Sequence, residues 1–563
     1  MQSKRTDRRH PLPLLILTAL LLSGCASLGD GTPDYDSLVR DLKASRSDDW
    51  QSLDAAFLRL PDFQDRLERL SALYAAGTGG DAAGGAARML DLYYGDLRAH
   101  ELSHRVALAD GDTERAAFHA AAGDAIAAAI EATGPGTAEA PHRTLTSAQA
   151  YALLEKRRRE VVGAFYETDD AAPRLTLVAR VREGRRRDVQ RIVAVHFDLT
   201  PTFVAGATVA ATLPGVEQAL PSAVVATRAA QGDSAAQTAY AIELWQQGPE
   251  FAARAVQWLQ AASESGNLVA REMLGVIYGS LASARSGEDA QRLLDAAVDQ
   301  FLLAVNQGSD TAMYNLAQLY LSGHFGEENQ PAGVSLLEQA AERDNLDAVV
   351  MLARLRYNGQ FVPEDRDAAV ALLVQASEAG HTDARLFYAR HLLSTDDGAG
   401  FDAQAYGWLV DAAEVGESGE AMMLLGTLHA DGDHAERDPD RAVGWFKRAA
   451  EGSRDAELVN SVAWILTVAE DRALRDPDAG LALMDRLMGE DAVAARNPAY
   501  LDTWAAAHAA TGDFEGAVAV QRDALAIAEQ EAEETGREPG YLPILREHLV
   551  LFEEGGTVTE DVP

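Results

Sequence analysis

The C-terminal half of the chain repeats one hydrophobic pattern. After each of a series of turn residues, small and large apolar residues recur at helical spacing, as in Ala312, Leu316, Ala317 and Tyr320. Residues three or four apart lie on one face of a helix, so each set marks a buried helix face. Successive turn residues lie 36 residues apart, at Gly308, Asp344, Gly380, Gly416 and Gly452. Because one helix pair cannot bury such a face alone, the pattern predicts a solenoid of stacked pairs.

This repeat resembles the Sel1-like repeat, a relative of the tetratricopeptide repeat, over residues 232–490. The shared features are the Ala-Leu-Gly-Tyr helix, a glycine-containing loop, an acidic start at Asp438-Pro-Asp-Arg-Ala442 and the end Trp445–Gly452. Two places depart from the pattern, since Arg356 replaces the last tyrosine and residues 283–290 add length. The resemblance implies a mostly α-helical chain with an extended concave face that binds proteins.

Two further elements are expected after the solenoid. Residues 491–530 have the pattern of one tetratricopeptide-like helix pair, with a turn at Gly512-Asp513. The polar segment 528–540 is expected to separate this pair from residues 541–554. These last residues have the pattern of a capping helix, which would close the apolar end of the stack.

The N-terminal half has a mixed pattern. Residues 35–133 are helical in character, and a further helix is expected over residues 147–166. Residues 175–182 then alternate between apolar and polar positions, and residues 192–199 are rich in branched and aromatic side chains. With a turn at Glu183-Gly184 between them, the two segments predict a β-hairpin.

These elements predict a smaller α+β domain over residues 35–200, joined to the solenoid by a linker at 201–231. The layout faintly resembles an uncharacterised domain of secreted bacterial proteins, a resemblance that implies no activity. The matching pieces are Asp34-Tyr-Asp36, Arg98-Ala-His100, Gly111–His119 and Val195-His-Phe-Asp198.

The first residues have the layout of a secretory signal peptide over residues 1–24. A basic head precedes the apolar run Leu14–Leu22, which is too short for a bilayer that needs roughly 20 residues. The tetrad Leu22-Ser-Gly-Cys25 resembles the lipobox of bacterial lipoproteins, which implies a covalent lipid on Cys25 and a tether at 25–34. By the same resemblance, Ala26 after the cysteine implies the outer membrane, with the chain facing the periplasm.

Composition excludes several classes of function. The net charge of −38 argues against a nucleic-acid partner, which requires a basic face. Cys25 is the one cysteine, so an intramolecular disulfide is impossible. The sequence has no phosphate-binding loop, dinucleotide fingerprint or Gly-x-Ser-x-Gly motif. No cofactor is therefore expected beyond the lipid on Cys25.

The segment His100-Glu-Leu-Ser-His104 fits the spacing of a zinc protease motif, in which two histidines bind zinc and the glutamate activates water. The flanking Arg98 and Arg105 do not suit that motif. A third ligand would also be needed, for which His119 and Glu114 are candidates, although neither lies in a recognised follow-on motif. The favoured interpretation is an amphipathic helix with two polar histidines and no metal. A zinc-dependent hydrolase remains the first alternative.

Arginines crowd the predicted hairpin. They are Arg180, Arg182, Arg185, Arg186, Arg187 and Arg191. In so acidic a protein, such a cluster could hold an anionic polymer such as an acidic glycan. The favoured interpretation is a solvated hairpin tip, with some arginines paired to the abundant acids.

The leading functional hypothesis is a non-enzymatic adaptor without catalytic residues. Envelope proteins would bind the concave face of the solenoid, and the lipid would hold the chain at the membrane. The resemblance to envelope lipoproteins with such repeats implies a role in secretion, polysaccharide export or cell-wall complexes. The sequence does not choose among these three.

Overall fold

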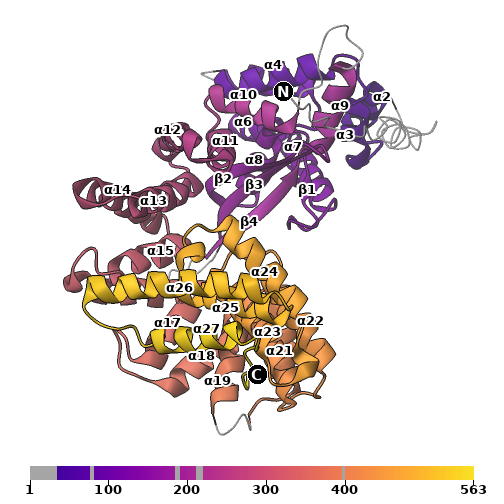
Figure 1. The fold of residues 1–563 in the computed structure, drawn as a ribbon. Helices are drawn as coiled ribbons and strands as arrows, with labels where there is room; N and C mark the ends of the chain where they lie inside the picture. Colours follow the sequence, from indigo (N-terminus) through magenta and orange to yellow (C-terminus); the bar gives the residue numbers. More distant parts are fainter. Residues whose placement is uncertain (1–33, 77–80, 184–190, 211–219, 396–399, 563) are drawn as a thin grey trace, which may run out of the picture. The chain divides into compact units, whose positions relative to one another are not determined.

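The computed structural model describes residues 34–76, 81–183, 191–210, 220–395 and 400–562. The predicted signal peptide, Cys25, Arg185, Arg186 and Arg187 lie outside these ranges. The chain divides into two compact units, Met1–Arg343 and Asp344–Pro563 (Figure 1). None of the described helices combines the length and the hydrophobicity that a membrane span requires.

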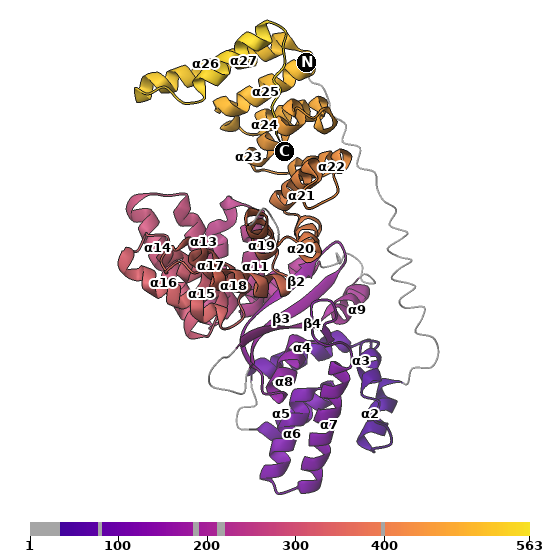
Figure 2. The same ribbon diagram turned by 90° about the horizontal axis from the view of Figure 1, so that it is seen from below.

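The first unit begins with helices whose starts are fixed by aspartates. The side chains of Asp34, Asp81, Asp96 and Asp112 each accept a hydrogen bond from a backbone N–H of the following first turn. This contact satisfies one of the N–H groups that a helix start leaves unpaired. Figure 2 shows α5, α6 and α7 side by side. The helices are α2 Tyr35–Lys43, α3 Gln51–Phe57, α4 Phe63–Ala76, α5 Ala82–Leu92, α6 Leu97–Ala109 and α7 Thr113–Glu131.

A four-stranded sheet follows, with strand order β1-β4-β3-β2. The elements are β1 His142–Arg143, α8 Ser147–Lys156, β2 Glu160–Asp169, β3 Arg174–Glu183 and β4 Arg191–Asp198. The predicted hairpin is confirmed, because β3 and β4 pair antiparallel with Leu177 opposite Phe197. Both side chains are fully buried among residues of α6, α7 and α8.

The helix expected over residues 147–166 is wrong in its second half. The helix α8 ends at Lys156, and Arg158 adopts a left-handed conformation with φ of 56° before β2 begins. The strand β2 then pairs with β3 and buries Ala164 and Tyr166 in the same core. Branched and aromatic residues of this segment, such as Val162 and Tyr166, pack well on a pleated surface, so the tertiary partner decides the conformation.

The segment expected as a linker over residues 201–231 contains two helices, α9 Thr200–Ala210 and α10 Pro221–Ala230. Val225 and Ala229 of α10 are buried in the core that holds the sheet. The first repeat helices follow in the same unit. They are α11 Ser234–Gln247, α12 Ala252–Glu264, α13 Leu268–Ser283, α14 Gly287–Asn306, α15 Asp310–Leu321 and α16 Gln330–Ala341. The extra residues near 283–290 lengthen α13 and α14.

The sheet and the first repeats are joined at the edge strand β2. The side chain of Asn267, which caps α13, donates to the carbonyl of Ala164 over 2.7 Å. At Gly163 a Cβ atom would lie 2.9 Å from the Asn267 Oδ1 atom, so glycine permits this close approach. An edge strand exposes unpaired backbone groups, and Asn267 satisfies part of them.

The second unit continues the repeat. Its helices are α17 Leu346–Asn358, α18 Arg366–Glu378, α19 Thr382–Ser394, α20 Ala403–Glu414, α21 Gly419–Asp431, α22 Pro439–Ala450, α23 Ala456–Val468 and α24 Pro477–Glu490. Most predicted turn residues adopt the left-handed conformation, with φ of 93° at Gly380 and 63° at Asp344. At the next turn this conformation moves from Gly416 to Glu417, so α21 begins 37 residues after α19, one residue more than the period of 36.

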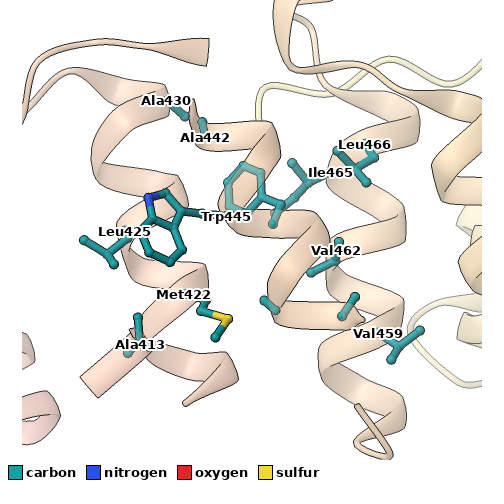
Figure 3. Close-up of a cluster of buried hydrophobic side chains, with 14 of the residues drawn as sticks. Ala413, Met422, Leu425, Ala430, Ala442, Trp445, Val459, Val462, Ile465 and Leu466 are labelled. Atoms are coloured by element: carbon teal, nitrogen blue, oxygen red, sulfur yellow. The ribbon is translucent and has the colours of Figure 1, made fainter. Parts of the chain in front are cut away.

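The core of the second unit runs between consecutive helix pairs. Figure 3 shows Leu425 of α21 and Trp445 of α22 on one side, with Val462 and Leu466 of α23 on the other. Each helix thus buries its apolar stripe against both neighbours, as the repeat pattern predicts. The fold class is confirmed as a mostly α-helical solenoid preceded by a small sheet.

The last helices are α25 Pro498–Ala510, α26 Phe514–Thr535 and α27 Leu542–Glu553. The predicted pair is confirmed, with its turn at Gly512, and the capping helix is present. The expected break after residue 528 is wrong, because α26 continues to Thr535 and ends at Gly536 with φ of 68°. Ala528 is fully buried, so packing rather than local polarity sets the length of this helix.

Candidate functional site

The three candidate histidines lie on α6 and α7. The ring of His100 is fully buried, and its Nε2 atom lies 2.9 Å from the carbonyl oxygen of Tyr94. Because that contact requires Nε2–H to donate, the neutral ring accepts at Nδ1 from the His119 Nδ1–H over 3.0 Å. Burial lowers the pKa of His100 to about 4, and burial also lowers the pKa of His119.

The other residues of the motif point to separate partners. The Nδ1 atom of His104 lies 2.8 Å from the carbonyl oxygen of Ala116, while Glu101 pairs with Lys156 over 2.6 Å. In the described part of the chain, no group of three or more His, Cys, Asp or Glu side chains is placed to hold a metal ion. The geometry therefore favours the structural interpretation, in which these side chains join α6 to α7 and α8.

Replacing His100 by glutamine tests whether the buried ring is held neutral. A ring whose pKa falls from 6.5 to about 4 on folding stabilises the fold above pH 6.5, and this contribution is lost as the pH falls towards 4. At about 1.4 kcal/mol per pKa unit, the shift corresponds to about 3 kcal/mol. In urea unfolding, we expect H100Q to be less stable than wild type at pH 7.5. The gap should shrink by about 3 kcal/mol near pH 4.

Other buried groups also change the stability of the protein with pH. Their contributions cancel when the free energy of unfolding of H100Q is subtracted from that of wild type at each pH. Burial raises the pKa of Asp54 to about 6 and that of Asp96 to about 7, so acid relieves a cost that both proteins share. A stability gap that stays constant between pH 7.5 and 4 would contradict the buried neutral ring.

Three arginines of the predicted patch, Arg180, Arg182 and Arg191, lie in the described part of the chain, and each interacts with other residues of the protein. Arg182 pairs with Glu160 over 2.8 Å and donates to the carbonyl of Gln307 over 2.9 Å. Burial raises the pKa of Glu272 in α13, and the nearby charge of Arg180 opposes that rise. Arg191 is also engaged by another residue. Among the described arginines, Arg182 thus joins the sheet to the repeats and Arg180 lies near a carboxylate of α13, which does not favour the anionic-polymer alternative.

A hollow of about 600 Å³ lies on the second unit, where α17, α19 and α21 of successive repeats present equivalent faces. Its charged and aromatic lining includes Arg354, Tyr357, Asp383, Phe387, Arg390, His391 and Glu420. Interfaces between proteins are enriched in arginine and aromatic side chains, and a concave surface can enclose a partner segment. This hollow is the candidate functional site.

Aromatic rings form one wall of the hollow. The rings of Tyr357 and Phe387 meet edge to face, with centroids 5.2 Å apart. The Tyr357 hydroxyl lies 3.0 Å from the Nδ1 atom of His391, and burial lowers the pKa of that histidine. With His391 neutral, the hydroxyl donates this bond and fixes the tyrosine ring in place.

The two arginines of the hollow differ in their partners. Arg390 forms an ion pair with Glu420 of α21. The guanidinium group of Arg354 lies over the Phe387 ring, 5.9 Å from its centroid, and has no ion-pair partner among the described residues. Arg354 is exposed, so a cation on an aromatic wall is available to a ligand.

The sequence analysis did not single out these residues. A usable signal was present, because Arg354 and Arg390 lie 36 residues apart and so occupy equivalent positions of two repeats. Equivalent positions face the same side of a solenoid, so the period itself places both arginines on one surface.

Comparison with known proteins identifies the repeat. A family model described as Sel1 repeat matches residues 252–267, 310–345, 346–381 and 419–453. Among curated proteins, none gives a significant match to this chain.

Two solved structures of repeat proteins match parts of this chain. A Sel1 repeat protein from Oxalobacter formigenes is 21% identical, with 44% of this chain and 94% of that chain covered and a TM-score of 0.35. The protective antigen c5321 of uropathogenic Escherichia coli, described as displaying an SLR fold, is 19% identical, with coverage of 64% and 81% and a TM-score of 0.36. On the evidence of the family match, this chain carries Sel1 repeats in its helical solenoid.

Proposed function

We propose that this protein is a lipid-anchored envelope scaffold that binds a segment of a partner protein in the hollow on α17, α19 and α21. The observation that carries the proposal is the exposed Arg354, which lies on the Phe387 ring without a carboxylate partner among the described residues. Arginine and aromatic side chains in a concave site are the groups that most often dominate binding energy between proteins.

The chemistry of the hollow defines the partner segment. A carboxylate of the partner would take both donor edges of the Arg354 guanidinium, because that planar group matches carboxylate geometry. An apolar side chain next to that carboxylate would pack on the half-buried rings of Tyr357 and Phe387. The preferred partner is therefore a segment with an acidic residue beside an apolar one.

The proposed location follows from the N-terminal sequence. Lipid on Cys25 would hold the repeats at the outer membrane, facing the periplasm, where two or three acyl chains anchor a protein firmly. Partners would then be envelope proteins, in a complex for secretion, polysaccharide export or cell-wall synthesis. The role is that of a binding module and not of an enzyme.

Reversing the charge at Arg354 tests the proposal. Full-length wild type and R354E are used to capture proteins from detergent-solubilised envelopes of the source cells, and bound proteins are quantified by mass spectrometry. Replacing an arginine that dominates an interface costs about 2 kcal/mol or more of binding free energy. We therefore expect capture of the partner to fall about 30-fold.

The matched control is R472E, which makes the same charge change at an exposed arginine of the same unit. Capture should survive in this control, because Arg472 lies outside the hollow. If R354E and R472E retain the partner equally well, the hollow is not the binding site.

A further inference from the structure

A second concave site lies in the first unit. It is a cavity of about 240 Å³ lined by residues of α3, α7 and α8 and of the segment around β1. Trp50, Ile126 and Leu145 contribute apolar walls, while Asp54 and Arg143 contribute charges of opposite sign. Drug-sized ligands occupy about 300–1,000 Å³, so this cavity suits a smaller molecule.

The negative charge of the cavity comes from Asp54. One oxygen of its carboxylate accepts a hydrogen bond from the hydroxyl of Tyr93, itself a buried side chain. A Cβ atom at Gly95 would collide with that hydroxyl, so glycine there makes room for the tyrosine. Burial raises the pKa of Asp54 to about 6, so the carboxylate is mostly ionised at neutral pH although it lines a partly apolar pocket.

The positive charge comes from Arg143 at the mouth of the cavity. Its side chain is 62% exposed, and its Nε atom lies 3.8 Å from Asp198. The charge of Arg143 lowers the pKa of Asp54 and so opposes the effect of burial, which indicates that the two charges act on each other across the pocket. A molecule inside the cavity therefore meets the Asp54 carboxylate and the more exposed guanidinium group of Arg143 on the same lining.

We propose that this cavity binds a small zwitterion, namely an α-amino acid with an aliphatic side chain. The ammonium group of the ligand pairs with Asp54, its carboxylate pairs with Arg143, and its side chain lies against Ile126 and Leu145. A buried carboxylate is costly until an opposite charge pairs with it, and the ligand ammonium supplies that charge. All residues that line this site belong to the first unit.

Three probes separate the contributions. The full-length chain, purified in detergent, is titrated by calorimetry with leucine, with 3-methylbutylamine, which lacks the carboxylate, and with 4-methylpentanoate, which lacks the amine. We expect leucine to bind and each half-ligand to bind at least about tenfold more weakly, because each loses one ion pair. If leucine, valine and alanine all fail to bind at millimolar concentration, the proposal is overturned.

Variants then locate the site. D54N and R143Q should each weaken leucine binding at least about tenfold, while D169N, which changes a half-exposed carboxylate that is paired with Arg174 and lies outside the cavity, should bind as wild type does. Asparagine at 54 can still accept the bond from Tyr93 and removes a buried charge, so D54N should melt at a higher temperature than wild type at pH 7.5. A D54N protein that is folded and binds leucine with wild-type affinity would overturn the assignment.

Discussion

Replacing Phe446 by alanine is expected to lower the free energy of unfolding of the second unit by about 3–5 kcal/mol. The ring is fully buried in α22, within a core that α21 and α23 share. Truncation removes the buried ring and leaves a cavity. The neighbouring helices α21 and α23 cannot move enough to fill that cavity. Because each repeat is stabilised through its neighbours, the loss should spread to the adjacent helix pairs. Urea unfolding followed by circular dichroism measures the change, with V415A as the control.

Val415 suits that control because it is 82% exposed in the same unit, so its truncation should change stability by less than about 0.5 kcal/mol. The result would be contradicted if F446A and V415A unfolded at the same urea concentration.

The partner of the ring gives a second measurement of the same contact. A Cβ atom added at Gly426 of α21 would collide with the Phe446 ring, so G426A should overpack the core and cost about 1–3 kcal/mol. In the double variant G426A/F446L, the smaller side chain makes room for the new methyl group. The double variant should therefore lose less stability than the sum of the two single variants. Simple additivity would show that the two positions do not touch.

This contact marks how far the sequence predicts the fold. The recurring small residue after leucine indicates a close approach between helices, and Gly426 confirms it. The same spacing does not reveal which ring fills the gap, because Phe446 lies on the next helix at a distance set by loop length. The equivalent pair in the first unit, Gly275 with Phe301, has the same arrangement. There too, the sequence indicates the close approach but not the ring that fills it.

The strand β2 shows why local pattern failed in the N-terminal half. Val161, Val162 and Tyr166 follow a good helix sequence, and their spacing alone fits a helix about as well as a strand. The deciding interaction is with β3, which a local window does not contain. Burial by a remote partner also explains the helices found where a linker was expected, since Val225 packs against the sheet core.

The candidate sites also combine features that the sequence reveals with features that only the fold reveals. The histidine motif was visible in the sequence, but the carbonyl groups of Tyr94 and Ala116 that engage His100 and His104 were not. The arginines of the hollow were predictable from the period. Asp54 and Tyr93 are 39 residues apart with no motif between them, so only the fold brings this pair together.

Replacing Cys25 by serine is expected to abolish attachment of the lipid. The proposed anchor requires a thioether bond, and Cys25 supplies the one thiol in 563 residues. Each buried methylene contributes about 0.8 kcal/mol to membrane binding, so loss of the acyl chains removes nearly all of the affinity. Cells are fed an alkyne-tagged fatty acid, and the label on the purified protein is measured. Labelled C25S protein, or an unlabelled wild type, would contradict the anchor.

Changing Ala26 to aspartate separates the lipid from its destination. The resemblance to bacterial lipoproteins implies that the residue after the cysteine directs sorting, so A26D should keep the label and move from the outer to the inner membrane fraction. The thiol is untouched in this variant, which makes it the matched control for C25S. If A26D keeps its label and stays in the outer membrane, residue 26 does not direct sorting. The lipid would then supply the attachment, and the partner bound by the repeats would become the candidate for selecting the membrane.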